Sequence, residues 1–354
     1  MKKRIISLAL SLALTVSALA GCGSSASATG TSASAGTKET SASDESSTSA
    51  DLSDVTLKVW AFEYTPELFK AAGVDDIPYN LDIVSFSGGN LAYQALAIDQ
   101  LDLTMGSEIP PLFAAETEGG GNFAIVASYK SSTLGQQLVV GPGQNITSVA
   151  ELKGKRVGYV EATTAHYFLA KMLENAGLTW NDIDAVPLSP SDGLSALMSG
   201  DIVAFALFGW AQINANEDAG GHLLESAEDI LSGNFHYAAN LRSLEDEKKR
   251  AAMVDFLIRM EKVFRWEAEH IDEYAKITKD YTSFELDVYE KQLTDDFKKQ
   301  RTEIYTNNTD AIASLQDVHD TLQGLGVLEN DLDVSTLFSD ALTEDLNAGL
   351  KALD

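Results

Sequence analysis

The sequence predicts an α/β fold with helices covering parallel sheets, and its internal pattern supplies the reasons. From Val55 to about Leu241, short runs rich in branched and aromatic residues alternate with stretches of helical periodicity. This alternation favours parallel strands, because each helix carries the chain back to the starting edge of the sheet. After Leu241 the pattern is helical alone, with charged faces typical of solvated helices. Roughly 300 residues from position 53 onward are enough for one large domain or two smaller ones.

Strands are expected where short apolar runs are bounded by turn residues. In chain order these runs are Leu57–Trp60, Leu81–Phe86, Leu101–Met105, Phe123–Ser128, Gln137–Val140, Arg156–Val160, Ala185–Leu188, Ile202–Phe208 and Phe235–Leu241. Helices are expected at Leu91–Ile98, Ala165–Ala176, Gly193–Met198, Ala251–Phe264 and Asp310–Leu322. Glu261 is the one polar break in the apolar face of the fourth of these helices.

The N-terminus has the features of an export signal. The cations Lys2 to Arg4 precede an apolar run, Ile5–Leu19, which has the length of a signal-peptide core and is short for a membrane span. The run ends in Leu19-Ala20-Gly21-Cys22, which looks like a bacterial lipobox, and Cys22 is the only cysteine. We therefore expect residues 1–22 to be a lipoprotein signal peptide ending in a lipidated cysteine. The alternative is an ordinary signal peptide that contains a cysteine.

A tether is expected between the lipid and the folded part. Gly23–Asp51 consists of Ser, Ala, Thr and Gly with scattered charges, and it has no aromatic or branched aliphatic residue. Such a segment cannot bury enough apolar surface to offset the entropy lost on ordering. Residues 23–52 are thus predicted to be disordered, and the protein to be extracytoplasmic, anchored to the outer face of the cell membrane by its N-terminal lipid.

Charge and side-chain chemistry narrow the possible functions. The formal net charge of −28 argues against binding to nucleic acid or docking on anionic lipid, although local dipoles still allow an anionic ligand in a buried site. The five histidines are scattered. Glu267, His270 and Glu273 fall on one side of a helix and are the candidate metal ligands. A Gly-x-Ser-x-Gly elbow and a phosphate-binding loop with its lysine are both missing. We expect no catalytic residues, no cofactor and no metal.

A candidate anion site lies where the predicted strand ending near Val160 meets the following helix. Thr163 and Thr164 fall at the helix N-terminus, and His166 follows within the first turn. Free backbone N–H groups, the positive end of the helix dipole and the two hydroxyls would suit an oxyanion. The alternative is that either threonine only caps the helix.

Two further strand-to-helix turns have similar chemistry. Phe86–Asn90 contains Ser87 and Gly88, and its glycines allow a tight turn and close approach of a ligand to the backbone. Met105–Pro111 contains Ser107 and Glu108. Turns at the carboxyl ends of strands are where an open α/β sheet forms its ligand crevice.

Several ordered segments carry a family resemblance. They are Ser87–Asn90 with Ala95–Asp102; Ile146 with Glu151–Val157, similar to an "I, then DLKGKRV" element; Thr163–Tyr167 with Leu173–Leu178; Leu188-x-Pro190-x-Asp192 with Ala196, Leu197 and Gly200; and Trp266, Leu315, Gly326-Val327 and Asp333-Val334. Together they span nearly all of 53–345. The chain resembles the ABC-transporter substrate-binding lipoproteins of the aliphatic sulfonate/taurine/nitrate-binding family.

The resemblance implies a fold and a role. The fold is bilobed, periplasmic-binding-protein-like and of type II, with two α/β lobes joined by two crossover strands. Lobe one would comprise 53–136 and 238–354, and lobe two 137–237. The protein would capture a small anionic or polar solute, most simply an aliphatic sulfonate, taurine or a nitrate-like ligand, for an ABC permease and ATPase. The implied ligand-binding residues are Tyr64, Ser87, Gly88, Ser107, Glu108, Gln136, Thr163, Thr164, His166 and Trp210.

One stretch departs from the family pattern. Many members have a Trp-Asp-Pro-Tyr-like sequence where this chain has Phe208-Gly209-Trp210-Ala211, so the carboxylate that would meet a ligand amine is absent there. Glu63 and Glu108 are other carboxylates near the expected cleft. A binding protein for a thiamine-precursor pyrimidine, an enzyme on the same fold and a sensor lipoprotein remain as alternatives.

Overall fold

The described part of the chain begins at residue 51. The computed structural model describes residues 51–354 except 62–64, 87, 118–119, 210–219 and 283–284. The predictions for the signal peptide, for Cys22 and for all but the last residues of the tether therefore lie outside the described residues. Within the described ranges, none of the helices combines the length and apolar character that crossing a membrane requires.

The first sheet has six strands in the order β11-β4-β10-β3-β1-β2. Strand β1 (Thr56–Trp60) pairs in parallel with β2 (Asn80–Ile83) and β3 (Leu103–Ser107). Strand β10 (Asn234–Asn240) lies between β3 and β4 (Phe123–Lys130) and is antiparallel to both, and β11 (Glu303–Tyr305) is antiparallel to β4.

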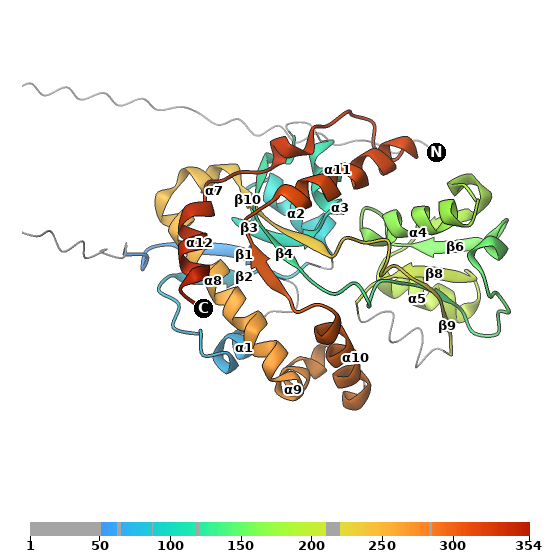
Figure 1. The fold of residues 1–354 in the computed structure, drawn as a ribbon, viewed down its shortest axis with the longest axis horizontal. Helices are drawn as coiled ribbons and strands as arrows, with labels where there is room; N and C mark the ends of the chain where they lie inside the picture. The colour runs from blue at the N-terminus through green and yellow to red at the C-terminus, as the bar shows by residue number, and fades with distance from the viewer. Residues whose placement is uncertain (1–50, 62–64, 87, 118–119, 210–219, 283–284) are drawn as a thin grey trace, which may run out of the picture. The chain divides into compact units, whose positions relative to one another are not determined.

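Helices pack on both faces of this sheet, as Figure 1 shows for α2 (Gly89–Ala97), α3 (Ile109–Ala115) and α11 (Thr309–Gly324) on one side and α8 (Glu247–Glu269) on the other. The short α7 (Leu241–Glu245) precedes α8, and α12 (Thr343–Lys351) packs against α8. A smaller apolar cluster joins three further helices, α1 (Pro66–Ala71), α9 (Ile271–Thr282) and α10 (Leu286–Lys299). This cluster places α10 beside the site described below.

The second sheet has five strands in the order β7-β6-β8-β5-β9. Its strands are β5 (Gln137–Val140), β6 (Arg156–Tyr159), β7 (Asp184–Pro187), β8 (Ala204–Leu207) and β9 (His222–Ser226). Strand β6 is parallel to β7 and β8, whereas β5 is antiparallel to β8 and β9. Figure 1 shows α4 (Thr164–Asn175) and α5 (Pro190–Ser199) on opposite sides of these strands, and both helices contact β6 and β8.

The chain passes from one sheet to the other twice, through residues 131–136 between β4 and β5 and through residues 227–233 between β9 and β10. Each sheet has its own apolar core. The predicted α/β class is confirmed, but the expectation of parallel sheets is wrong in part because both sheets are mixed. Strands β5 and β10, which are entered directly from a crossover, run opposite to neighbours that are linked by helices, and β11, which follows α10, is antiparallel to its neighbour β4.

Two strands differ from the sequence-based expectation. Strand β11 falls in the region predicted to be helical alone, and β9 was not predicted. A three-residue strand has no detectable period, so β11 exists through its pairing with β4. The buried Glu261 of α8 supports β11, because one of its carboxylate oxygens accepts the Ile304 N–H at 2.9 Å and the other accepts from Arg265 at 2.9 Å. The polar break in the predicted helix is thus a tertiary contact.

Candidate functional site

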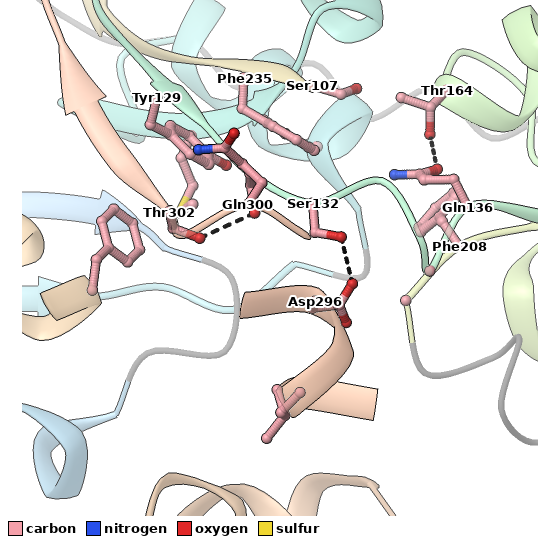
Figure 2. Close-up of a pocket in the computed structure, with 18 of the residues that line it drawn as sticks. Ser107, Tyr129, Ser132, Gln136, Thr164, Phe208, Phe235, Asp296, Gln300 and Thr302 are labelled. Atoms are coloured by element: carbon pink, nitrogen blue, oxygen red, sulfur yellow. Dashed lines mark hydrogen bonds between the residues drawn. The ribbon is translucent and has the colours of Figure 1, made fainter. Parts of the chain in front are cut away.

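A cavity of 320 Å³ opens where the ends of strands from both sheets meet the crossover segments. Figure 2 shows its walls. Residues of the first sheet and its turns, such as Ser107, form one side, and Thr164 at the start of α4 and Phe208 after β8 form another. The first crossover contributes Ser132 and Gln136, and the cavity is completed by the region of α8 to β11.

Two helices begin at this cavity. Helix α2 starts at Gly89 after Gly88, and no side chain caps its N-terminus. Helix α4 starts at Thr164 after Thr163, whose Oγ1 accepts the Ala165 N–H at 3.3 Å and donates to the Val160 carbonyl at 2.7 Å. Thr163 is therefore the cap that one interpretation of the sequence expected. Both helix starts direct the positive ends of their dipoles toward the same cavity, as oxyanion sites require.

Thr164 is engaged differently from Thr163. Its hydroxyl donates to Oε1 of Gln136 at 2.6 Å, so the start of α4 is hydrogen bonded to the first crossover (Figure 2). Both side chains are buried and line the cavity. This contact joins the second sheet to the crossover at the point where an oxyanion would sit.

Aromatic rings make up much of the remaining wall. They are Trp60, Tyr129, Phe208, Phe235, Phe264, Tyr274, Tyr289 and Phe297. The rings of Tyr129 and Phe235 stack with their centroids 5.1 Å apart and their planes at 17°. Apolar walls with a few placed polar groups are typical of small-molecule sites.

The charged groups at the cavity are acidic. The described residues that line it include Asp296 and Glu267 but no lysine, arginine or histidine. Oδ1 of Asp296 accepts from Ser132 Oγ at 2.6 Å, and Oδ2 accepts from Gln292 at 2.9 Å. Burial raises the pKa of the Asp296 carboxyl. An anionic ligand here would be held by backbone dipoles and neutral donors rather than by a cationic side chain.

The residues expected to bind ligand separate into three groups. Gly88, Ser107, Gln136, Thr163 and Thr164 line the cavity. Glu108 and His166 are each 4 % exposed and are not among the lining residues. The remaining three lie outside the described residues, namely Tyr64, Ser87 and Trp210.

His166 packs among aromatic rings instead of facing the cavity. Its imidazole centroid lies 4.7 Å from that of Tyr159 and 4.9 Å from that of Trp180. Burial lowers the pKa of His166 to about 4, so the ring is neutral at physiological pH. It contributes packing at the start of α4 and no positive charge for an acidic ligand.

Glu108 lies behind Ser107, and its carboxylate accepts a hydrogen bond from Ser232 of the second crossover at 2.6 Å. Burial raises the pKa of Glu108 from 4.5 to about 6, against the opposing effect of that hydrogen bond. The carboxyl thus connects the turn after β3 to a crossover segment rather than facing a ligand.

The raised pKa of Glu108 predicts a pH-dependent stability. The folded protein binds this proton more tightly than the unfolded chain, so stability should fall as pH rises from about 4.5 through about 6. We expect Glu108→Gln, which stays neutral, to raise the free energy of unfolding by about 1–2 kcal/mol near pH 7.5 and by little near pH 4.5. Urea unfolding at both pH values measures the difference. Parallel pH profiles for the two proteins would contradict the prediction.

Most of the wall supplied by the C-terminal region was not predicted. Tyr289, Leu293 and Asp296 recur at helical spacing along α10, Gln300 follows the end of that helix, and all four line the cavity. The sequence signal for this wall is the apolar face of α10, which the acidic residue Asp296 continues. No group of three metal-ligating side chains occurs within the described part of the chain.

Two mixed β-sheets covered by helices, two crossovers and a cavity at the strand ends define a protein of the periplasmic-binding-protein fold. The chain belongs to the NMT1/THI5-like family, whose model matches residues 67–246. This confirms the family recognised from the sequence.

Curated relatives carry a sulfonate-binding name. The chain is similar to the aliphatic sulfonates-binding protein of Escherichia coli K12, with 29 % identity over 157 residues, which are 44 % of this chain and 49 % of that protein. It thus spans about half the length of that relative (49 %) in the match. It is also 27 % identical over 255 residues to the aliphatic sulfonates-binding protein of Bacillus subtilis 168, covering 68 % of this chain and 75 % of that one.

Solved structures share the fold. The alkanesulfonate-binding protein SsuA from Xanthomonas axonopodis pv. citri, bound to MOPS, matches with a TM-score of 0.72 at 19 % identity, over 81 % of this chain and 99 % of that one. The desulfurization enzyme DSZB matches with a TM-score of 0.62 at 16 % identity, over 84 % and 99 %. The fold therefore hosts both binding proteins and an enzyme, and function must be argued from the site.

Proposed function

We propose that this protein is the extracytoplasmic solute-binding subunit of an ABC importer and that it captures an aliphatic sulfonate. The observation that carries the proposal is the pair of helix N-termini, α2 at Gly88 and α4 at Thr164, that open on one cavity. Three sulfonate oxygens can each accept from backbone N–H groups and hydroxyls there without a cationic side chain. The sulfonate-binding names of the relatives support the same ligand class.

The lobes and partners follow from this role. We infer that residues 53–136 with 238–354 form lobe one, that 137–237 form lobe two, and that hinge motion at the crossovers closes the cavity on its solute. The partners are the permease and ATPase of the importer. The lipid on Cys22 and the tether 23–52 would hold the protein at the outer face of the membrane.

A thiamine-precursor pyrimidine is the second candidate. The stacked rings of Tyr129 and Phe235 at the cavity favour a flat aromatic ligand. Nitrate is less suited, because it has no apolar part to contact the aromatic wall of the cavity.

Titration with matched ligands tests the proposal. Alkanesulfonates should raise the melting temperature and change tryptophan fluorescence, since a ligand that binds only the folded protein stabilises it by mass action. The carboxylates of equal chain length serve as controls and should bind at least about tenfold more weakly. If the pyrimidine binds and no sulfonate does, the ligand in the proposal changes to the pyrimidine. If a sulfonate is turned over during incubation, the protein is an enzyme rather than a binding protein.

A further inference from the structure

The first turn of α4 has a second face, which does not line the ligand cavity. Thr163 and Thr164 line the cavity, whereas His166 and Tyr167 are not among the lining residues. Both of these side chains are nonetheless buried, at 4 % and 3 % exposed. Successive residues of a helix point in different directions, so one turn can contact a ligand on one face and pack on its other face.

The packing partners of this second face belong to the first sheet, although α4 covers the second. Tyr167 lies in the apolar core of the first sheet and not in that of its own sheet. Its hydroxyl donates to Oδ2 of Asp317 on α11 at 3.2 Å. The His166 imidazole stacks on the ring of Phe113 on α3, with centroids 6.2 Å apart and planes at 29°. The start of α4 is therefore joined to two helices of the other sheet (Figure 1).

The chemistry of Tyr167 suits such a contact. Burial, and then the Asp317 carboxylate, raise the pKa of the Tyr167 hydroxyl, so the hydroxyl keeps its proton and donates it. A hydrogen bond to an ionised acceptor is stronger than one between neutral groups. The ring packs in the core while the hydroxyl reaches Asp317 at the surface, as tyrosine does at interfaces.

The contact lies one helical turn from the cavity wall on both of its sides. On α4, Tyr167 follows Thr164 by one turn. On α3, Phe113 follows Pro110 by one turn, and Pro110 lines the cavity. The start of α2 is adjacent as well, since a Cβ atom at Gly89 would lie 3.3 Å from Cγ of Pro110. The two helix starts proposed to hold the sulfonate are thus linked through α3.

This link matters because the two sheets are otherwise separate bodies of the fold. Each has its own apolar core, and the chain joins them through two crossovers. A ligand that needs both helix starts binds only those molecules in which both face the cavity. Its apparent affinity falls in proportion to the fraction of such molecules.

We propose that Tyr167 is a positioning residue of the ligand site, which holds the start of α4 beside the starts of α2 and α3 through its contact with Asp317. This inference rests on the proposed function and adds to it a residue that acts on the ligand without touching it. It gives the His166-Tyr167 pair a role in joining the two sheets rather than in ligand contact.

Isothermal titration of the full chain with 1-butanesulfonate tests the inference. Tyr167→Phe removes the hydroxyl and keeps the ring, and it should weaken binding by about three- to tenfold, the range of one hydrogen bond. Asp317→Ala should weaken binding equally, whereas Asp317→Asn keeps an acceptor oxygen and should recover most of that loss. The double variant Tyr167→Phe with Asp317→Ala should lose no more than either single variant. Additive losses would mean that the two residues act separately and would overturn the inference.

The matched control is Tyr79→Phe. Tyr79 is a similarly buried tyrosine of the first-sheet core, 6 % exposed, beside Asp255 of α8, and it is not among the residues that line the cavity. Its substitution should lower stability and leave the affinity unchanged. The same result in Tyr167→Phe would make Tyr167 a core residue only and would overturn the inference. Tighter binding in Tyr167→Phe would overturn it as well, because the contact would then oppose closure.

A second measurement needs no ligand. Spin labels on Met198→Cys of α5 and Ala348→Cys of α12, both exposed sites, report the distance between the two sheets in a Cys22→Ser chain. Tyr167→Phe should broaden the distribution of that distance, and Tyr79→Phe should not. If the unaltered protein binds no alkanesulfonate, the proposed function fails and this distribution alone decides the inference. An unchanged distribution in Tyr167→Phe would then overturn it.

Discussion

Replacing Thr164 by valine is expected to weaken sulfonate binding by about ten- to a hundredfold, the effect of one hydrogen bond to a charged group. Valine keeps the shape and the branched carbon, so α4 should still begin at the same residue. It removes the hydroxyl that lines the cavity and donates to Gln136 at 2.6 Å. The hydroxyl has one proton, which it donates to Gln136, so valine removes the support of the Gln136 side chain, and the ligand loses the hydrogen bond from the amide Nε2 that this support holds at the cavity. Isothermal titration with an alkanesulfonate measures the change.

The matched control is Thr179→Val. Thr179 is exposed, does not line the cavity, and hydrogen bonds to Asp182 at the start of a short helix (Trp180–Asp182). Its loss should lower stability slightly and leave ligand affinity unchanged. Unchanged affinity in Thr164→Val would mean that the hydrogen bond from Thr164 to Gln136 does not support ligand binding, because valine keeps the backbone N–H groups at the start of α4.

Gly193→Ala is expected to destabilise the protein by about 1–3 kcal/mol or more, because it overfills the core of the second sheet. A Cβ atom at Gly193 would lie 2.1 Å from Cζ of Phe205, a fully buried side chain of β8. Phe205→Ala should cost about 3–5 kcal/mol through the cavity it leaves. In Phe205→Ala, however, the added methyl group meets empty space, so Gly193→Ala should then cost little or stabilise. Urea unfolding of the single and double variants measures this coupling.

Leu223→Ala is the control for that cycle. Leu223 belongs to β9 of the same sheet but is 47 % exposed, so its truncation should change stability by at most about 0.5 kcal/mol. Additive effects of Gly193→Ala and Phe205→Ala would show that the glycine is not required for packing against this ring.

The order of secondary structure was largely readable from the sequence. The segment predicted as a helix over Ala165–Ala176 is α4 at Thr164–Asn175, and the run Gln137–Val140 is β5. Such elements are encoded locally, by periodicity and by the residues that end them. Strands β9 and β11 were not predicted because neither contains an apolar run long enough to show a strand pattern; β9 has the sequence His-Leu-Leu-Glu-Ser and β11 has three residues.

The sequence predicted residues of the site only at the turns that follow strands. Gly88, Ser107 and Thr164 were predicted because a turn after a strand has a local signature, and all three line the cavity. Gln136 was found through the family resemblance. His166 and Glu108 were expected beside them, but the side chains of adjacent residues in a turn or first helical turn point in different directions. Both lie buried behind the wall.

Composition and local pattern therefore indicated the α/β class and a turn with anion-binding chemistry, and the resemblance of the ordered motifs indicated the family to which the chain belongs. The tertiary structure decided the electrostatic character of the cavity. Asp296 belongs to a helix whose charges, taken in sequence, suggest only a solvated face, as Asp295 confirms. The small cluster of α1, α9 and α10 turns one side of that helix toward the cavity, so Asp296 lines the cavity although its neighbour Asp295 faces the surface. Which side of a helix is buried depends on its packing partners, and these come from segments far apart in the chain.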